Sequence, residues 1–92
     1  MIRESIVQYR QVIFECRRRI QALEQTTSGY MEMAAKLRGS EDPNAYDFHQ
    51  RLMDEMLPMV AADIDLEKRI IKTAEEKIGR ISALLSEMGD AS

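Results

Sequence analysis

The chain has 92 residues, of which 45% are hydrophobic and 32% are charged, and its formal net charge is −3. This length allows one domain at most, and a high charged fraction with few Pro and no Trp favours long helices over β-structure. The longest uncharged apolar run, Met56–Ala62, is far too short to span a membrane. Cys16 has no second cysteine to pair with, and the first residues lack the apolar core of a signal peptide. We therefore expect a soluble, cytoplasmic protein.

A long apolar repeat with helical period begins near residue 2. Its members follow one another by four and three residues without a slip, which predicts a helix over about residues 2–38 with one continuous inward stripe, termed the seam. Thr26–Gly29 has poor helix propensity and could instead form a loop. The seam keeps its register across these residues, which favours a single helix. The seam positions are Ile2, Ile6, Tyr9, Ile13, Cys16, Ile20, Leu23, Thr27, Tyr30, Ala34 and Leu37.

Residues 39–42 carry the signals of a helix end followed at once by a helix start. Gly39 suits a left-handed helix stop, Ser40 and Asp42 suit side-chain caps, and Pro43 suits a first helical turn. This order predicts a tip between two antiparallel helices, so the whole chain, 1–92, is expected to form one helical hairpin.

The second helix is predicted over about residues 43–88, with a frayed tail at 89–92. Pro58 removes one backbone hydrogen bond, to the Asp54 carbonyl, and crowds that carbonyl, so we expect a kink at Pro58. The alternative is a break into two helices. The expected seam, with Gln50 and Glu67 at its two polar steps, is Tyr46, Met53, Leu57, Val60, Ile64, Ile71, Ala74, Ile78, Ile81 and Leu85.

A second apolar stripe lies beside the seam of the second helix and widens its apolar face beyond what one partner helix covers. A two-helix hairpin has one interface and no closed core, and chains this small seldom fold stably that way. We therefore expect completion as a four-helix bundle by homodimerisation, or docking on another helical protein. The predicted interaction residues are Phe48, Leu52, Met56, Met59, Leu66 and Ile70.

Charge is divided unevenly between the two arms. Residues 1–38 hold seven Lys/Arg against four Asp/Glu, giving +3, and residues 39–92 hold six against twelve, giving −6. With the tip near residue 41, three arginines of the first arm face three carboxylates of the second. This match favours a network of ion pairs that fixes the register over a nucleic-acid-binding patch. The predicted network is Arg17, Arg18, Arg19, Asp63, Asp65 and Glu67.

No catalytic, cofactor or metal motif is found in the sequence. His49 is the sole histidine and has no Glu three residues before it, so the Glu-x-x-His pairs of a di-iron bundle are missing. One His and one Cys within an apolar stripe do not favour nucleophilic catalysis. Seven Met residues, several of them near the tip, predict either an adaptable docking face or ordinary core filling.

The layout of a long helix, a Gly/Asp/Pro tip and a second helix opening at Asp42–Tyr46 resembles in outline the helical hairpins of type III secretion needle subunits and their small co-chaperones.

The two seams, the surplus apolar stripe and the lack of a catalytic motif predict a non-enzymatic module for protein–protein interaction, in the form of a small dimeric adaptor or assembly subunit. The alternative is a chaperone-like or secretion-related helical module whose apolar face binds a different protein.

Overall fold

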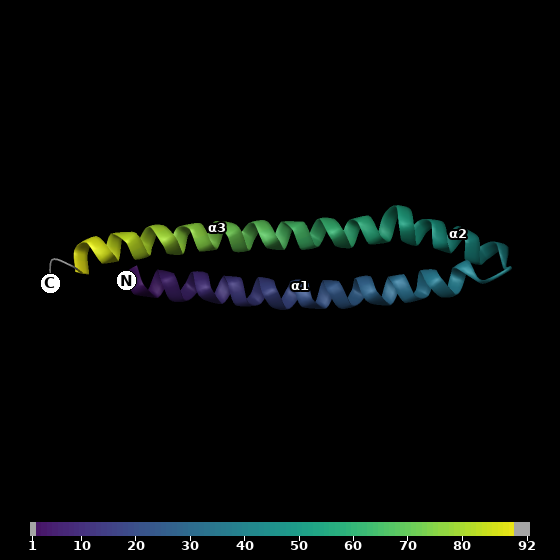
Figure 1. The fold of residues 1–92 in the computed structure, drawn as a ribbon, viewed down its shortest axis with the longest axis horizontal. Helices are drawn as coiled ribbons and strands as arrows, with labels where there is room; N and C mark the ends of the chain where they lie inside the picture. Colours follow the sequence, from purple (N-terminus) through teal and green to yellow (C-terminus); the bar gives the residue numbers. More distant parts are fainter. Residues whose placement is uncertain (1, 90–92) are drawn as a thin grey trace.

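The computed structural model describes residues 2–89 and shows two long antiparallel helical arms lying side by side (Figure 1). The first arm is α1 (Ile2–Arg38), and the second contains α2 (Pro43–Arg51), a π-helix (Leu52–Met56) and α3 (Leu57–Gly89). The molecule measures 73 × 16 × 16 Å and has a radius of gyration of 20.7 Å, whereas a compact domain of this length would have about 12 Å. The predicted all-α antiparallel hairpin is therefore confirmed, as an extended rod.

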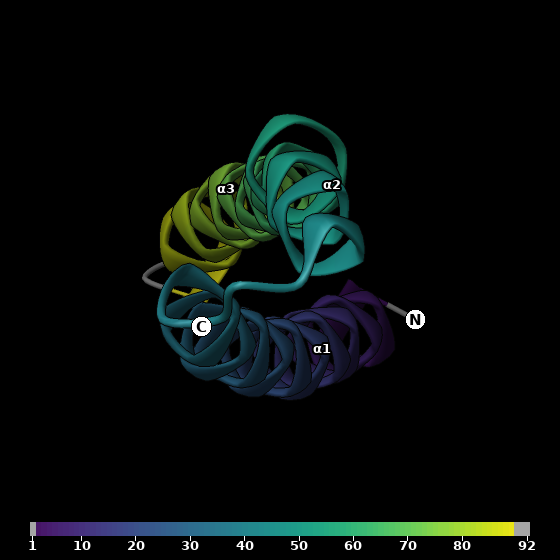
Figure 2. The ribbon, with the colours of Figure 1, turned by 90° about the vertical axis from the view of Figure 1, so that its right-hand side faces the viewer.

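Seen end-on from the tip, the two arms lie against each other, and none of the elements of residues 2–89 covers either flank (Figure 2). The predicted frayed tail begins at Gly89, which is instead the last residue of α3. The rest of that predicted tail lies outside the described residues.

Helix α1 is unbroken, and the loop alternative at Thr26–Gly29 is wrong. The hydroxyls of Thr26 and Thr27 donate to the carbonyls of Ala22 and Leu23, at 3.1 and 3.0 Å, so these side chains are satisfied within the helix itself. Every predicted α1 seam position from residue 6 to residue 37 is buried or half-buried. The four-three repeat therefore located the inward face of this arm correctly.

The tip is built by Ser40 and Asp42 as expected, but not by Gly39. No glycine among residues 2–89 has a positive φ, so the predicted left-handed stop at Gly39 is wrong. Helix α1 ends instead in a tight turn in which the Ser40 N–H donates to the Leu37 carbonyl at 3.1 Å. Asp42 then caps α2, because its Oδ1 accepts the Asn44 N–H at 3.0 Å and Pro43 occupies the first turn.

The second arm stays helical through Pro58, which excludes a break there. The disturbance lies one turn earlier, in the π-helix, where the Leu57 N–H donates to the carbonyl of Leu52 five residues back. The wider turn is visible between α2 and α3 (Figure 1). Since proline has no N–H and crowds the preceding turn, a widened turn just before it relieves both problems. Pro58 therefore follows a π-turn instead of distorting an α-helix.

The π-helix also shifts the inward face of the second arm before residue 57 by one residue. The predicted seam placed Tyr46 and Met53 inward, together with Gln50, but all three are exposed, Tyr46 at 68%. The buried and half-buried positions there are Ala45, His49, Leu52 and Met56. A π-turn adds one residue to the helix. Beyond it, all the predicted inward positions from Leu57 to Leu85 are buried or half-buried.

The interior of the hairpin is a single line of side chains between two helices. Leu52 and Cys16 are fully buried, and most other inward residues keep some contact with solvent. A closed core would need a third or fourth helix over the open flanks. The buried hydrophobic residues are Ile13, Cys16, Ala34, Ala45, Leu52, Val60 and Ala74.

Replacing the α2 cap tests the tip. Asp42→Ala removes the acceptor of the Asn44 N–H, and we expect it to lower the free energy of unfolding by about 1 kcal/mol. Urea denaturation at one fixed protein concentration measures this change. The neighbouring exposed residue provides the control, Glu41→Ala, which should have little effect; equal losses in both variants would show that the cap is not what holds the tip.

Deleting one residue tests the π-helix as a register device. Removal of Glu55, combined with Pro58→Ala, should turn the π-turn into α-helix and keep both seams facing α1, so the melting temperature should stay within a few degrees of wild type. Removal of Glu76 from the regular part of α3 should rotate the rest of that helix out of register and lower the melting temperature strongly. Circular dichroism melts compare the two, and equal destabilisation would contradict a register role.

Candidate functional site

The hairpin leaves many large hydrophobic side chains in solvent. Among residues 2–89, thirteen of them are at least 36% exposed, and Val7, Met59 and Tyr46 are each more than 60% exposed. Soluble monomers seldom tolerate contiguous apolar surface of this kind, which usually serves an interaction. The positions of these side chains on the rod determine which surface a partner could cover.

Helix geometry sorts the exposed side chains onto two flanks. A residue that directly precedes an inward residue lies on one flank, and a residue that directly follows one lies on the other, because consecutive residues are about 100° apart around a helix. Met33 precedes the buried Ala34, whereas Met31 follows the half-buried Tyr30. Seven large exposed side chains precede inward residues and are termed the apolar flank: Val12, Met33, Phe48, Met59, Leu66, Ile70 and Leu84.

Two shallow grooves show that this flank is continuous across both arms. One, of about 320 Å³, has largely apolar walls and brings Val12 and Tyr9 of α1 against Ile70 of α3. The second, of about 340 Å³, is also largely apolar and brings Ala22 of α1 against Leu66 of α3. Apolar side chains from the two helices thus share one open surface along the rod.

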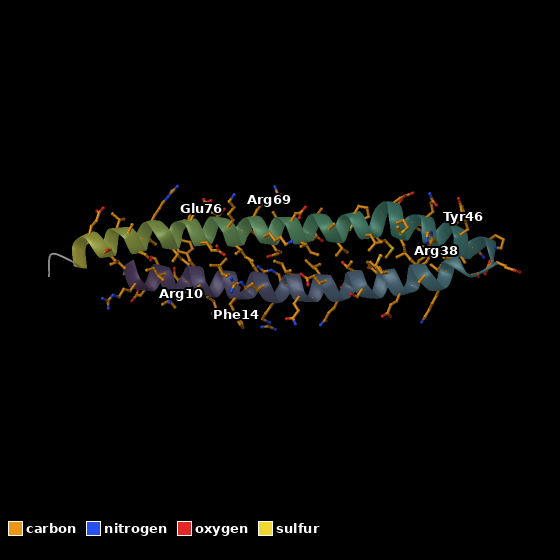
Figure 3. The ribbon with its side chains drawn as sticks, viewed as in Figure 1. Arg10, Phe14, Arg38, Tyr46, Arg69 and Glu76 are labelled. Carbon is orange, nitrogen blue, oxygen red and sulfur yellow. The ribbon has the colours of Figure 1, made fainter. Side chains whose placement is uncertain are left out.

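The opposite flank is charged through its middle. A groove there is lined by Arg10, Arg17 and Glu75 with Ile13 and Ile78 beneath them, and about half of its wall is polar. Phe14 also borders it but points to the outer side of α1, away from α3 (Figure 3). Near the tip this flank becomes apolar, with three exposed side chains that follow inward residues, termed the tip patch: Met31, Tyr46 and Met53.

The predicted interaction stripe is placed only in part on the apolar flank. Phe48, Met59, Leu66 and Ile70 lie there and are exposed. Leu52 is fully buried between the arms, so its assignment to an outer stripe is wrong, and Met56 is half-buried. The cause is the one-residue shift at the π-helix.

Sequence reasoning left two α1 residues, Val12 and Met33, out of the interaction site. The signal was present, since each directly precedes a seam residue and so shares a side with its neighbours on the other arm. Their contribution makes the surface a property of both helices and not of the second arm alone.

The predicted ion network reduces to one pair in the structure. Arg19 Nε lies 2.9 Å from Glu67 Oε1, and this pair joins the two arms at a seam position. Within residues 2–89 the other ion pair is Arg51–Glu55, at 3.8 Å within one arm. Neither pair includes the remaining predicted members, so their part of the network is wrong: Arg17, Arg18, Asp63 and Asp65.

Cys16 completes a small polar cluster around that pair. The Arg19 guanidinium donates to Cys16 Sγ at 3.3 Å, and Cys16 is fully buried. Burial, reinforced by the adjacent Glu67 carboxylate, raises the pKa of the Cys16 thiol, which keeps it protonated and poorly nucleophilic. The hydrogen bond from Arg19 lowers the pKa of Glu67 below its ordinary 4.5, with a further contribution from the thiol. The cluster links the two arms at one height of the rod.

The described part of the chain also bears on metal binding and membrane insertion. No group of three or more His, Cys, Asp or Glu side chains there is arranged to hold a metal ion. His49 faces α1 near the tip, and its Nε2 is buried without a hydrogen-bond partner. Of the helices in residues 2–89, none is long and apolar enough to cross a membrane.

Comparisons of the chain with models of known protein families, with curated proteins and with solved structures found no match.

The pH dependence of stability tests the Arg19–Glu67 pair. Because the pKa of Glu67 is lower in the folded chain than its ordinary 4.5, the contribution of this carboxylate is complete above about pH 4.5 and is lost as the pH falls through the folded value. Glu67→Gln should lower the melting temperature at pH 7, and the difference from wild type should narrow at pH 3.

The control for this test is Glu76→Gln, because Glu76 lies on the outer side of α3, away from α1 (Figure 3). Melts of all three proteins at one concentration supply the comparison. A wild-type advantage over Glu67→Gln that is constant from pH 7 to pH 3 would contradict the assigned role of the carboxylate.

Proposed function

We propose that this protein is a non-enzymatic helical interaction module, a small dimeric adaptor or assembly subunit whose hairpin is completed as a four-helix bundle by a second copy. The observation that carries the proposal is the apolar flank, which runs along a rod with only one line of interior side chains. Burying one such side chain stabilises a protein by roughly 1.5–3 kcal/mol. A second hairpin over this flank supplies the missing layer.

The proposal includes a reducing, cytoplasmic setting. Cys16 is the sole cysteine and is buried in contact with Arg19. A buried thiol without a partner cysteine is a packing residue and not part of a disulfide framework.

A second candidate function is a chaperone-like or secretion-related module that binds a different protein. The tip patch favours it, since Met31 and Met53 are 54% and 40% exposed beside the highly exposed Tyr46. Methionine side chains repack around varied shapes, and exposed Met with an aromatic ring suits an adaptable contact. In this alternative the partner, and not a second copy, covers exposed apolar surface.

A charge placed on the apolar flank tests the leading proposal. Leu66 is 51% exposed in the hairpin, so Leu66→Asp should leave the monomeric hairpin folded. In the dimer it would place an unpaired carboxylate in the dry contact between copies. We expect sedimentation equilibrium to show a shift from dimer to monomer, with a dissociation constant raised at least tenfold.

The control is Lys72→Asp, which alters charge at an exposed position of α3 on the other flank. It should leave assembly nearly unchanged. A wild-type protein that sediments as a compact, stable monomer at micromolar concentration would refute the dimeric proposal and direct attention to a different partner.

A further inference from the structure

We infer that a second copy of this chain covers the apolar flank with both tips at the same end of the dimer, so that each α1 packs on the α3 of the other copy. This inference rests on the self-association proposed above and adds the surface used and the relative direction of the two rods.

Exposed apolar side chains are distributed differently over the two flanks of the rod. The apolar flank extends from Met33 and Phe48 near the tip, through Leu66, to Val12 and Ile70 in the distal half. The opposite flank is interrupted by Arg10, Arg17 and Glu75. Charged residues are depleted in the cores of stable interfaces. The apolar flank also carries charged residues, since Arg19 and Asp63 line one of its grooves and Arg69 and Lys77 line the other, but the walls of both grooves are largely apolar and Arg19 is paired with Glu67. Of the two flanks, the apolar one therefore offers a partner the more apolar contact.

The area of one side of the rod is also sufficient. A side of 73 × 16 Å has an outline of roughly 1,200 Å², and specific protein interfaces typically bury about 800 Å² per partner. A second hairpin has the same length and the same apolar flank, so it covers this surface from end to end. An isologous contact of this kind closes as a dimer and leaves no open end for further growth.

The opposite net charges of the two arms favour one relative direction of the two copies. Face-to-face packing about a twofold axis allows two arrangements. With tips at the same end, each α1 lies on the α3 of the other copy, and with tips at opposite ends α1 lies on α1 and α3 on α3. The first arm carries +3 and the second −6. Like arms repel in the second arrangement, whereas opposite arms attract in the first.

Local matching along the flank agrees with the same direction. Residues that share a groove lie at the same distance from the tip along the rod. When the tips of both copies are at the same end, each of these residues faces its groove neighbour in the other copy. Val12 then meets Ile70 of the other copy, and Ala22 meets Leu66 of the other copy, because each pair already shares a groove within one chain. Arg19 and Asp63, which border one groove, are likewise brought together between copies. With tips opposed, these heights no longer correspond.

Two methionines of α1 give a matched test of the flank. Met33 lies on the apolar flank and Met31, two residues away, lies on the tip patch, with exposures of 41% and 54%. Met33→Asp should raise the dimer dissociation constant at least tenfold in sedimentation equilibrium, whereas Met31→Asp should change it less than threefold. Equal helix content of the two variants by circular dichroism establishes that both are folded. Dissociation by Met31→Asp with Met33→Asp still dimeric would overturn the choice of flank.

A spin label at the tip tests the direction. In the Cys16→Ala, Glu41→Cys chain, pulsed electron resonance should give one distance between labels of about two helix diameters, roughly 20–30 Å. Opposed tips would separate the labels by nearly the 73 Å length of the rod, and that result would overturn the inference. If the loss of Cys16 prevents folding, Glu41→Cys alone serves, because Cys16 is buried. A short bis-maleimide should then link the two tips in high yield, and failure to link a protein shown to be dimeric would also overturn the inference.

These outcomes separate the inference from the proposed function. A dimer with opposed tips, or one joined through the tip patch, would refute the assigned flank and direction but would agree with the proposed interaction module. A wild-type chain that remains monomeric would refute both the dimeric function and this inference.

Discussion

A pair of helices has one interface, and this constraint governs the rest of the structure. Each helix of the hairpin can bury only the stripe that faces its neighbour, so most inward side chains keep one edge in solvent. Hydrophobic burial is the main favourable term in folding, and a single line of contacts provides little of it for a chain of 92 residues. The exposed apolar side chains beside that line are where further burial is available.

The sequence was sufficient to predict α1 because its repeat has no irregularity. From Ile6 to Leu37 every seam position faces inward, including Thr27, whose hydroxyl is satisfied within the helix. The start of the second arm at Pro43 was also predicted correctly, but its inward face was predicted correctly only from residue 57 onward. A π-turn has no strong sequence signal beyond the proline that follows it, and periodicity alone counts an α-helical step where the chain makes a longer one. That single residue moved Leu52 from the outer stripe to the interior and Tyr46 from the interior to the surface.

An ion pair between the arms was predictable from the sequence, but the number of such pairs was not. Opposite charges at matching heights correctly indicated a link between the arms, yet within residues 2–89 only Arg19 forms an ion pair with a carboxylate of the other arm. Glu67 occupies an inward position and its side chain is 15% exposed, so it gains from a fixed partner. Charges farther from the seam remain solvated, where an ion pair contributes little and the side chains lose entropy to form it. A matching distance from the tip is therefore not sufficient to predict an ion pair, because the angular position around each helix decides which charges can meet.

Because one short tip joins the arms, the sequence separation of contacting residues increases with their distance from the tip. Next to residues 39–42 the facing residues are close in sequence, whereas Tyr9 and Lys77, whose ammonium lies 5.6 Å from the ring centre, are joined only after most of the chain is ordered. Loop-closure entropy rises with the length of the closed segment. Pairing of the arms is thus least costly beside the tip. We therefore expect the arms to pair there first, and the terminal ends of α1 and α3 to be the last to join and the first to separate.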